Sequence, residues 1–241
     1  NLLSIYNIVV PDNITLKASL QVNAQQANVT RISLLSGASS LLVANDNGVI
    51  SQWFEVLKNG ERKFTQIREF QADKTVRALA PEHNRKGFAT LSGDNHIELF
   101  YTTSHARLYA ENLGTTALDA IALSPRNSAL LLQQNDQFQL FHVHNEHPEV
   151  SWSSLWTQVW YEGYPDPQFV WQSTSASDDF EPKLSLVPLA FGTLKAAFYA
   201  MLFAVPIALA GAIYAGYFMS AGMRNFVKPT VEIMAALPTV I

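Results

Sequence analysis

The chain has 241 residues, with 16 basic and 20 acidic side chains, a formal net charge of −4 and no cysteine. This balance gives no electrostatic footprint for nucleic acid, and a chain without cysteine forms neither disulfides nor thiolate metal sites. The length allows one large domain or two smaller ones. Charge is unevenly distributed, since residues 184–241 carry only Lys195, Arg224, Lys228 and Glu232. We therefore expect two environments, and we expect the chain to be a fragment of a longer protein.

Three segments in residues 1–149 repeat a turn residue, alternating apolar positions and a final aromatic residue. They are NGVISQW (47–53), DNHIELF (94–100) and NDQFQLF (135–141). Two strand-like runs precede each segment, at 29–36 and 40–45, at 75–82 and 87–92, and at 117–125 and 128–134. A further strand-like run follows the first two segments only, at 63–70 and 105–113.

Short strands in units of 41 to 47 residues resemble the blades of a WD40-type β-propeller, although the Trp-Asp dipeptide is missing. Because a blade cannot bury both of its faces alone, we expect neighbouring blades to stack. Three units and the strand-like run at 14–22 are too few to close a ring. Residues 1–149 are therefore predicted to be an incomplete all-β propeller portion, with the other blades upstream of Asn1. A β-sandwich with hairpins of similar length is the alternative.

This region offers little catalytic chemistry. His142 and His144 would share one face of a strand, with His147 close behind, but histidines at a solvated strand end are commoner than a zinc site. A carboxylate that caps its own backbone explains the aspartates that recur at the turns. These are Asp46, Asp94 and Asp136. We predict no metal, no cofactor and no catalytic residue, so the chain is not expected to be an enzyme.

Most of the tryptophans lie between residues 152 and 171. In SWSSLWTQVWYEG (151–163), apolar residues follow the spacing of one face of a helix, with Ser151 as the N-cap and Gly163 as the end. Indole rings favour the membrane–water boundary, so the tryptophans of this face are predicted to lie there. They are Trp152, Trp156 and Trp160. Packing of these residues under the last blade is the alternative.

Residues 161–183 contain three prolines and a Ser/Asp-rich run, which is typical of a linker. Residues 150–189 are thus predicted to be a Trp-rich amphipathic helix and a linker. From Ala196 to Met219 no side chain is charged. At 1.5 Å per residue a helix of this length spans about 36 Å, enough to cross a hydrocarbon core of about 30 Å. We therefore predict a transmembrane helix in residues 190–220.

Two features of this helix favour a bundle of several helices over a single anchor. Small residues at every fourth position would let another helix approach closely. They are Ala196, Ala200, Ala204, Ala208, Ala212 and Gly216. Pro206 is predicted to kink the helix in mid-span, which a bundle tolerates because neighbouring helices satisfy the freed carbonyl group. Residues 221–241 are predicted to form a cytoplasmic elbow and the start of the next membrane helix.

The back of the chain resembles a known family. LSLVPLAFGTLKAAFYAMLFAVPIALAGAIYAGYFM (184–219) and KPTVEIMAALPTVI (228–241) are similar to the PstC-type permease subunits of the phosphate-specific type I ABC importer. The resemblance covers roughly residues 160–241. It implies a long form with an extra domain between the first two membrane helices, in a multi-pass protein of the bacterial inner membrane. The propeller portion would then be periplasmic.

The resemblance also implies partners and site residues. The partners would be a second permease subunit, cytoplasmic ATPase subunits, a periplasmic phosphate-binding protein and the lipid bilayer. Glu232 and Pro238 match the family motif at the start of the next helix, where Pro238 would bend the chain and Glu232 would suit the helix dipole. The residues of the phosphate path are expected beyond Ile241. The alternatives are a membrane-tethered β-propeller that acts as a binding or sensing scaffold, and a type I importer permease for another solute.

Overall fold

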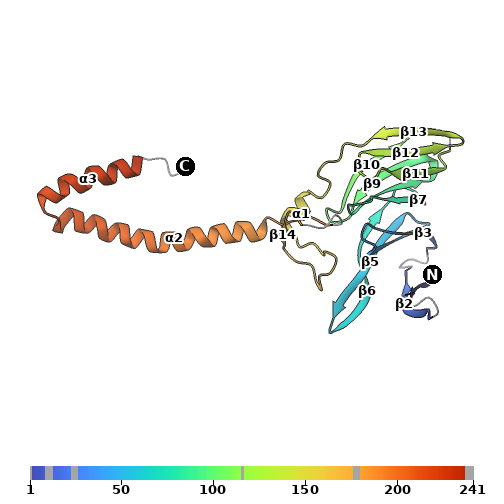
Figure 1. The fold of residues 1–241 in the computed structure, drawn as a ribbon, viewed down its shortest axis with the longest axis horizontal. Coiled ribbons are helices and arrows are strands. Elements are labelled where there is room, and N and C mark those ends of the chain that lie inside the picture. The colour runs from blue at the N-terminus through green and yellow to red at the C-terminus, as the bar shows by residue number, and fades with distance from the viewer. Residues whose placement is uncertain (1, 9–12, 23–26, 115–116, 176–179, 237–241) are drawn as a thin grey trace. The chain divides into compact units, whose positions relative to one another are not determined.

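The computed structural model of the chain describes residues 2–8, 13–22, 27–114, 117–175 and 180–236. The chain divides into two compact units, Asn1–Pro188 and Leu189–Ile241. The first unit consists mainly of antiparallel β-strands, and the second consists of helices (Figure 1).

Two four-stranded sheets and one three-stranded sheet make up most of the first unit. Within each sheet the strands are antiparallel and follow one another in chain order. The first sheet contains β3 (Val29–Leu34), β4 (Ser40–Asn45), β5 (Val49–Lys58) and β6 (Glu61–Gln71). The second contains β7 (Val76–Pro81), β8 (Gly87–Ser92), β9 (His96–Tyr101) and β10 (Ala106–Asn112). The third contains β11 (Ala120–Leu123), β12 (Ala129–Gln134) and β13 (Gln137–His142).

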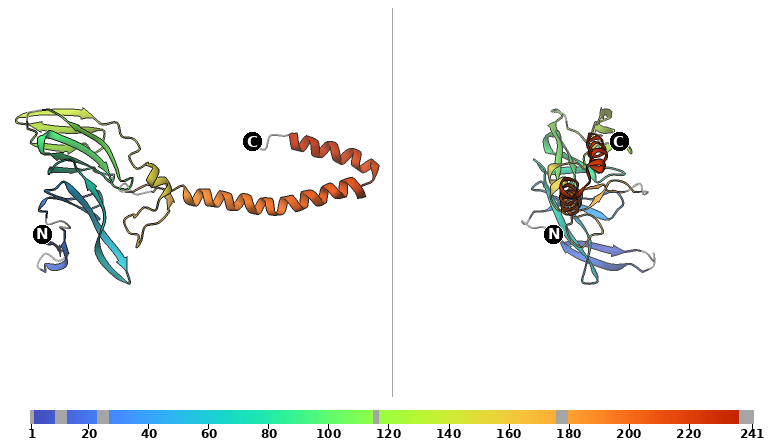
Figure 2. Two further views of the ribbon diagram at one scale, coloured as in Figure 1. Left: turned by 180° about the vertical axis from the view of Figure 1, so that it is seen from behind. Right: turned by 90° about the vertical axis from the view of Figure 1, so that its left-hand side faces the viewer.

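The three sheets stack face to face as neighbouring blades. Their first strands are adjacent, because β3 contacts β7 and β7 contacts β11, and the sheets fan out from these strands (Figure 2). The ring of Phe70 in the first sheet packs against Phe88 and Phe100 of the second, with centroids 5.3 and 5.7 Å away. Leu130 and Leu132 of the third sheet belong to a core cluster with residues of the second. The fold is therefore a WD40-like β-propeller portion, as predicted, and the sheets of the described residues do not close into a ring.

Hairpin turns between the strands use residues that tolerate a left-handed backbone. Asn59 and Gly60 connect β5 to β6 with φ values of 53° and 82°. An Asn-Gly pair with positive φ at both positions is typical of a type I′ hairpin turn. Gly48 has a φ of 81°, and a Cβ atom there would lie 2.7 Å from the carbonyl oxygen of Ala72. Both the backbone conformation and this close approach require glycine at position 48.

A two-stranded hairpin precedes the blades. It pairs β1 (Leu2–Asn7) with β2 (Thr15–Gln21), and the sequence predicts only the second of these strands. Leu3 and Leu20 of the hairpin pack on a cluster that contains Val43 and Trp53 of the first sheet. The hairpin therefore covers apolar side chains on the face of the first sheet that is turned away from the second.

The helix at the end of the blades is shorter than predicted. It is α1 (Trp152–Trp156), and Ser151 is its N-cap as the sequence predicts. The predicted continuation to Gly163 is wrong, because Thr157 is extended. Val159 is buried and forms a β-bridge with Gln168.

The stretch that the sequence suggests is a linker is partly packed. It contains β14 (Trp171–Gln172), which pairs with β15 (Lys183–Leu184). Tyr161, Glu181 and Lys183 are buried. We call residues 150–186 the pre-helix segment. It belongs to the compact first unit.

The second unit contains a long helix and a shorter one. The first is α2 (Val187–Ile213), which starts two residues before the unit does and runs through Pro206 as one helix. A π-helical turn, η2 (Tyr214–Phe218), follows it, and α3 (Ala221–Ala236) comes after an extended Met219. By length and composition Val187–Phe218 is the one described helical stretch able to cross a membrane. Pro206 lies inside α2 without interrupting it, the predicted kink there stays a prediction, and the regular helix ends at η2.

We predict that Phe88→Ala lowers the free energy of unfolding by about 3–5 kcal/mol, because removal of a buried ring leaves a cavity between two blades. Phe138→Ala is the matched control, since that ring is 65% exposed and its loss should change stability by less than about 1 kcal/mol. Urea denaturation followed by near-UV circular dichroism measures both variants. Equal losses would contradict a core formed by stacked blades.

Candidate functional site

A buried ion pair joins the two four-stranded sheets to the pre-helix segment. Lys86 precedes β8 and is 4% exposed, and its Nζ lies 2.8 Å from Oε2 of Glu162. The same Nζ donates to the carbonyl oxygen of Ser36 at 2.6 Å. Oε1 of Glu162 accepts a hydrogen bond from Ser40 Oγ at 2.5 Å, and Ser40 Oγ accepts one from Gln52 Nε2 at 2.9 Å. Removal of Glu162 would leave the buried Lys86 ammonium without its counter-charge, which is strongly destabilising.

Two further ionisable groups lie near this pair. Arg68 is on β6, and its Nη2 donates to the carbonyl oxygen of Trp160. Burial raises the pKa of the Glu181 carboxyl to about 7, and the positive charge of Arg68 offsets only part of this effect. The negative charge of Glu162 raises that pKa further, while Lys86 and Lys183 lower it. At neutral pH Glu181 is therefore a carboxyl group close to its titration midpoint.

Aromatic rings surround the ammonium group of Lys183. Its Nζ lies 4.8 Å from the ring centroid of Phe180, 5.5 Å from that of Tyr161 and 5.9 Å from that of Tyr164. It also donates to Oε1 of Gln172 at 3.3 Å. Burial lowers the pKa of Lys183, and the charge of Glu181 opposes this effect. Cation–π contacts of this kind stabilise an ammonium group that has lost part of its water.

Hydrogen bonds connect α1 both to the second blade and to the residue before α2. Ser151 caps α1 through a capping box with Ser154, and Ser151 Oγ donates to the carbonyl oxygen of Ser104 at 3.0 Å. The backbone N–H of Leu186 donates to the carbonyl oxygen of Leu155 at 2.9 Å. The residue before α2 is thus hydrogen-bonded to α1, and the N-cap of α1 is hydrogen-bonded to the second blade.

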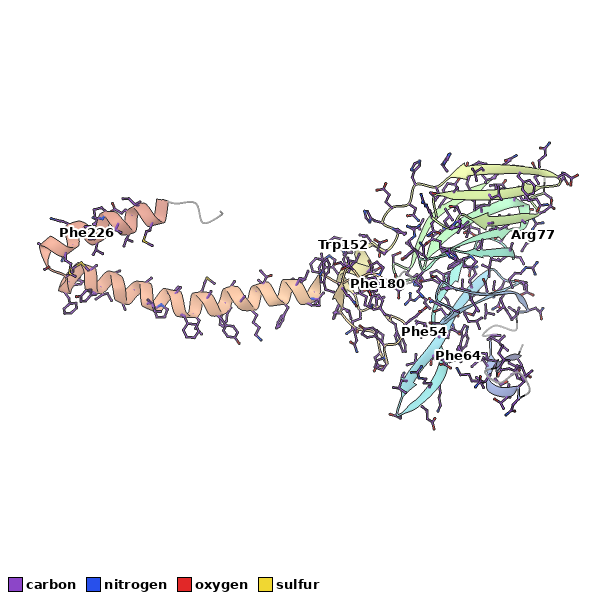
Figure 3. All side chains as sticks on the ribbon, viewed as in Figure 1. Phe54, Phe64, Arg77, Trp152, Phe180 and Phe226 are labelled. Atoms are coloured by element: carbon purple, nitrogen blue, oxygen red, sulfur yellow. The ribbon has the colours of Figure 1, made fainter. Side chains whose placement is uncertain are left out.

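The three tryptophans predicted to share a face do not all do so. Trp152, on α1 (Figure 3), is 80% exposed, and its ring centroid lies 6.1 Å from that of Trp156, which is 41% exposed. Trp160 is half-buried instead. Its ring packs edge-on against Phe54, and its Nε1 donates to the carbonyl oxygen of Tyr164. The membrane interface stays a prediction for Trp152 and Trp156, whereas Trp160 lies against the first blade.

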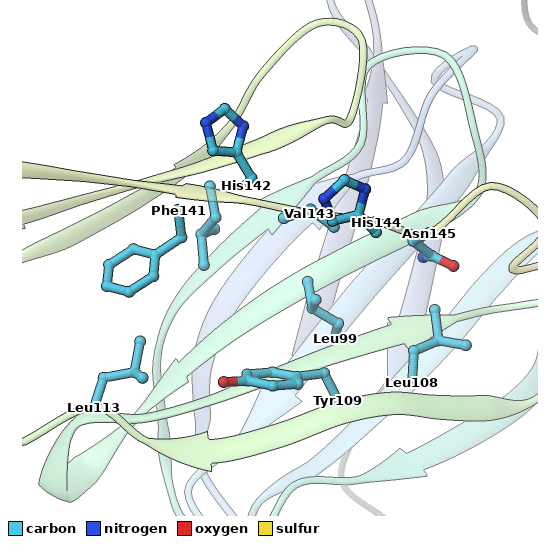
Figure 4. Close-up of a pocket in the computed structure, with 10 residues that line it drawn as sticks. Leu99, Leu108, Tyr109, Leu113, Phe141, His142, Val143, His144 and Asn145 are labelled. Atoms are coloured by element: carbon cyan, nitrogen blue, oxygen red, sulfur yellow. The ribbon is translucent and has the colours of Figure 1, made fainter.

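The histidines of the third blade line a cavity and do not form a three-ligand group. His142 and His144 border an apolar cavity of about 370 Å³ between the second and third sheets, together with Tyr109 and Phe141 (Figure 4). His147 lies elsewhere, with Nδ1 3.4 Å from Oε1 of Glu149. Among the described residues, these three histidines do not form a group whose ligand atoms lie close enough together to hold one metal ion.

A group of potential metal ligands that sequence spacing misses lies at the edge of the second blade. Asp73, His96 and Glu98 offer ligand atoms within 4.8 Å of one another. Arg107 already forms ion pairs with both carboxylates, because its Nη1 atom lies 2.7 Å from Oδ1 of Asp73 and 3.0 Å from Oε1 of Glu98. The group is therefore an ion-pair network. Only folding brings these residues together, since Asp73 precedes β7, His96 and Glu98 are on β9 and Arg107 is on β10.

The turn aspartates differ from one another. Asp46 does not cap its own turn, because its carboxylate accepts hydrogen bonds from the backbone N and from Nδ2 of Asn28, each at 3.0 Å. Asp94 adopts a left-handed conformation with a φ of 60°. Asp136 is exposed in the turn before β13. The prediction of self-capping is therefore wrong for Asp46, which ties the first blade to the residue that precedes β3.

The small residues predicted for helix packing lie along one helical stretch. Ala196, Ala200, Ala204, Ala208 and Ala212 are in α2, and Gly216 is in η2. None of these residues is buried. Their role in packing stays a prediction.

Two other residues of the predicted family motif have a different status. Glu232 lies well inside α3, which begins at Ala221, so the predicted favourable position at a helix start is wrong. Pro238 lies outside the described residues.

We predict that the stability of the first unit falls as pH rises through the interval between 4.5 and 7. The pKa of Glu181 is raised in the folded state from 4.5 to about 7, so the folded protein holds this proton more tightly than the unfolded chain does. The loss should reach about 1 kcal/mol per pH unit within that interval. Chemical denaturation at a series of pH values measures it.

Glu181→Gln tests the assignment of this pH dependence. The variant should be more stable than the parent at alkaline pH and should show a flatter pH profile, because no buried carboxyl has to ionise. Glu61→Gln, at an exposed position on β6, is the control and should keep the parent's profile. An unchanged profile in Glu181→Gln would contradict the assignment.

Comparison with known proteins gives structural neighbours only. No family model and no curated protein matches the chain. The crystal structure of Sqt1 from Chaetomium thermophilum is 15% identical, with a TM-score of 0.45, over 54% of this chain and 33% of that chain. The Cps50 (Swd1) β-propeller domain from Myceliophteria thermophila is 12% identical, with a TM-score of 0.45, over 54% of this chain and 42% of that chain.

A chain of the Mitotic Checkpoint Complex is 12% identical, with a TM-score of 0.44, over 62% of this chain and 48% of that chain. The chain thus spans between a third and a half of the length of these structures. Similarity at this level carries no information about partners. The propeller assignment rests on the strand order and on the stacking of the sheets.

Proposed function

We propose that the chain is part of a membrane permease subunit of an ABC importer, with the propeller portion outside the lipid. The observation that carries this proposal is the uncharged stretch of α2, which has no buried residue along its length. An apolar helix of this kind needs lipid or other helices around it. Its small residues at every fourth position suit close contact with another helix, which a single anchor would not need.

The helix that follows α2 also favours a permease with several membrane helices over a simple anchor. In α3 the charged residues Arg224, Lys228 and Glu232 recur at every fourth position and so share one face. Its other faces expose apolar side chains, among them Phe226 and Ile233. A helix with one charged face and apolar remaining faces suits a boundary between lipid and water or between helices.

The sequence resemblance to PstC-type permeases extends this proposal to inorganic phosphate as the solute. On this proposal the chain hydrolyses nothing itself. A second permease subunit, cytoplasmic ATPase subunits and a periplasmic phosphate-binding protein would complete the transporter. A type I importer permease for another solute would have the same features in residues 1–241.

The orientation proposed is a periplasmic propeller portion and a cytoplasmic α3 in a bacterial inner membrane. Arg224 supports a polar end of the span after η2, because its Nη2 donates to the carbonyl oxygens of Gly216 and Met219 at 2.8 and 3.3 Å. A cation at the C-terminal end of a helix also interacts favourably with the helix dipole. The positive-inside rule does not decide the orientation, because Lys183 and Lys195 near one end of the span balance Arg224 and Lys228 near the other. The resemblance to the permease family is what favours the cytoplasm for the end that carries Arg224.

A second candidate is a membrane-tethered β-propeller that binds a protein partner. The observation that favours it is an exposed apolar strip on the third sheet, where Leu131 pairs with Leu140 and Phe138 lies beside them. Exposed apolar patches of this kind commonly mark protein interaction sites. This reading needs no contact between α2 and other membrane helices, so experiments on α2 separate it from the permease.

We predict that Ala204→Leu combined with Ala208→Leu prevents assembly with partner subunits or abolishes solute uptake, while membrane insertion is preserved. Added bulk blocks the approach of another helix, but lipid accommodates it. Ala210→Leu is the matched control, because it adds the same bulk on the opposite side of the helix. Co-purification of subunits and radiolabelled phosphate uptake measure the effect. Full assembly and uptake in the double variant would favour the tethered scaffold.

Topology can be tested with single cysteines, since the chain contains none. Ser173→Cys precedes the span and Asn225→Cys follows it, and both positions are exposed. A membrane-impermeant thiol reagent added to intact cells should label position 173 and should reach position 225 only after permeabilisation. The reverse pattern would place the propeller portion in the cytoplasm.

A further inference from the structure

Large aromatic side chains of the pre-helix segment remain exposed although the segment itself is packed against the blades. They come from two separate places, α1 and the residues at β14. We call them the exposed aromatic group: Trp152, Trp156, Phe169 and Trp171. These side chains are between 38% and 80% exposed. Sequence periodicity indicated only the two members on α1, because Phe169 and Trp171 belong to no helical pattern.

Backbone hydrogen bonds hold both parts of this group beside the start of α2. The N–H of Leu186 donates to the carbonyl oxygen of Leu155 on α1 at 2.9 Å. The N–H of Ser185 donates to the carbonyl oxygen of Val170, next to β14, at 3.0 Å. Each member of the exposed aromatic group lies within three residues of Leu155 or Val170. Since α2 begins at Val187, the group surrounds the last residues before the helix.

The length of the apolar stretch fixes the depth at which those residues lie in a bilayer. Val187–Phe218 has 32 residues, which at 1.5 Å each gives about 48 Å, or about 45 Å at the average tilt of about 20°. A bilayer is about 40–45 Å thick with its headgroups, and its hydrocarbon core is about 30 Å thick. The first turn of α2 therefore lies at headgroup level when the helix spans the membrane. Lys195 is about 12 Å further along, and its flexible stem lets the ammonium reach back to that level.

The other end of the same stretch also carries exposed aromatic residues. Tyr214, Tyr217 and Phe218 of η2 are all more than half exposed. Aromatic side chains, and Trp and Tyr in particular, are enriched at both membrane–water boundaries. The exposed aromatic group and η2 thus mark the two ends of one span.

The charge of the two parts favours a neutral lipid surface over an anionic one. Residues 150–161 and 167–175 contain no charged side chain. Without Lys or Arg there is no attraction to anionic lipids of the kind that basic segments show. Without Asp or Glu there is no repulsion from them either. Contact would therefore depend on the aromatic rings.

We propose that the exposed aromatic group inserts into the headgroup region of the membrane that α2 crosses, and so holds the first unit at the lipid surface. The inference rests on the proposed span of α2. Lipid is the occupant that the structure favours, because the group is continuous along the chain with the helix that faces lipid. Trp160 has no part in this contact, since its ring packs against Phe54.

Two attachments at one place would limit the movement of the propeller portion. With α2 alone, the residues before the helix could bend and let the blades tilt freely above the membrane. Insertion of rings on both sides of Ser185 and Leu186 removes exposed apolar surface from water in one orientation only. The propeller portion would then be held in a fixed orientation at the membrane surface.

The test uses nitroxide labels on single cysteines of the full chain, reconstituted in phosphatidylcholine vesicles. Trp152→Cys and Trp171→Cys report the exposed aromatic group, and Leu202→Cys reports the middle of α2. Phe138→Cys on β13 is the matched control, because it also replaces an exposed aromatic residue. Electron paramagnetic resonance measures how often each label collides with molecular oxygen, which concentrates in lipid, and with a water-soluble nickel chelate.

We expect the labels at positions 152 and 171 to have a ratio of oxygen to nickel collisions between those at positions 138 and 202. A ratio equal to that at position 138, with lipid contact at position 202, would overturn this inference and leave the span of α2 intact. Protection from both reagents would overturn it as well, because protein would then cover the group. Water contact at position 202 would contradict the span of α2, and this inference with it.

A double variant tests whether the tryptophans hold the first unit at the membrane. Trp152→Ser combined with Trp171→Ser should move a label at Phe169→Cys out of lipid, with a loss of its oxygen collisions and a gain of nickel collisions. Phe138→Ser combined with Leu140→Ser is the matched control and should leave that label unchanged. All four substituted side chains are exposed, so the fold should be kept. Equal lipid contact of the label in both double variants would overturn the holding role.

Discussion

Face-to-face stacking of apolar sheets is the constraint on which the structure of the first unit depends. An antiparallel blade of three or four short strands cannot cover both of its own faces, so each blade is stable only against a neighbour. Phe70, Phe88 and Phe100 form this contact between the first two blades. A second cluster repeats it between the second and third blades, and the N-terminal hairpin covers part of the remaining face of the first.

Stacking also creates the polar sites of the unit. The pre-helix segment packs against both of the first two blades, through Glu162 with Ser40 and Lys86 and through Trp160 with Phe54. It brings Glu162 and Glu181 into a region where water is scarce, which is costly unless opposite charges are present. Lys86, Arg68 and Lys183 supply those charges. The result is a joint held by ionic contacts and aromatic rings, directly before the residues that lead into α2.

The two units differ in how their apolar side chains are shielded from water. In the first unit apolar side chains are removed from solvent by other parts of the same chain. In α2 none of them is buried, and the helix has no charged residue from Ala196 onward. Such a helix is stable only if lipid or further helices surround it. The backbone of a helix needs no outside partner, because its hydrogen bonds are made within the segment, and this is why α2 remains regular for so long.

The sequence by itself determined those features that follow from a local period. Alternating apolar residues, with Asn, Asp and Gly at the hairpins, were sufficient to predict the blade strands, and the uncharged run was sufficient to predict α2. Local spacing failed at α1, because a helical period of apolar residues does not say what they face. Val159 and Trp160 leave the helix and pack toward the blades. The contact of Lys86 with Glu162 joins residues 76 positions apart, and that of Arg68 with Trp160 joins residues 92 positions apart. Only the tertiary structure decided these, since no local pattern encodes which distant charges a fold will bury together.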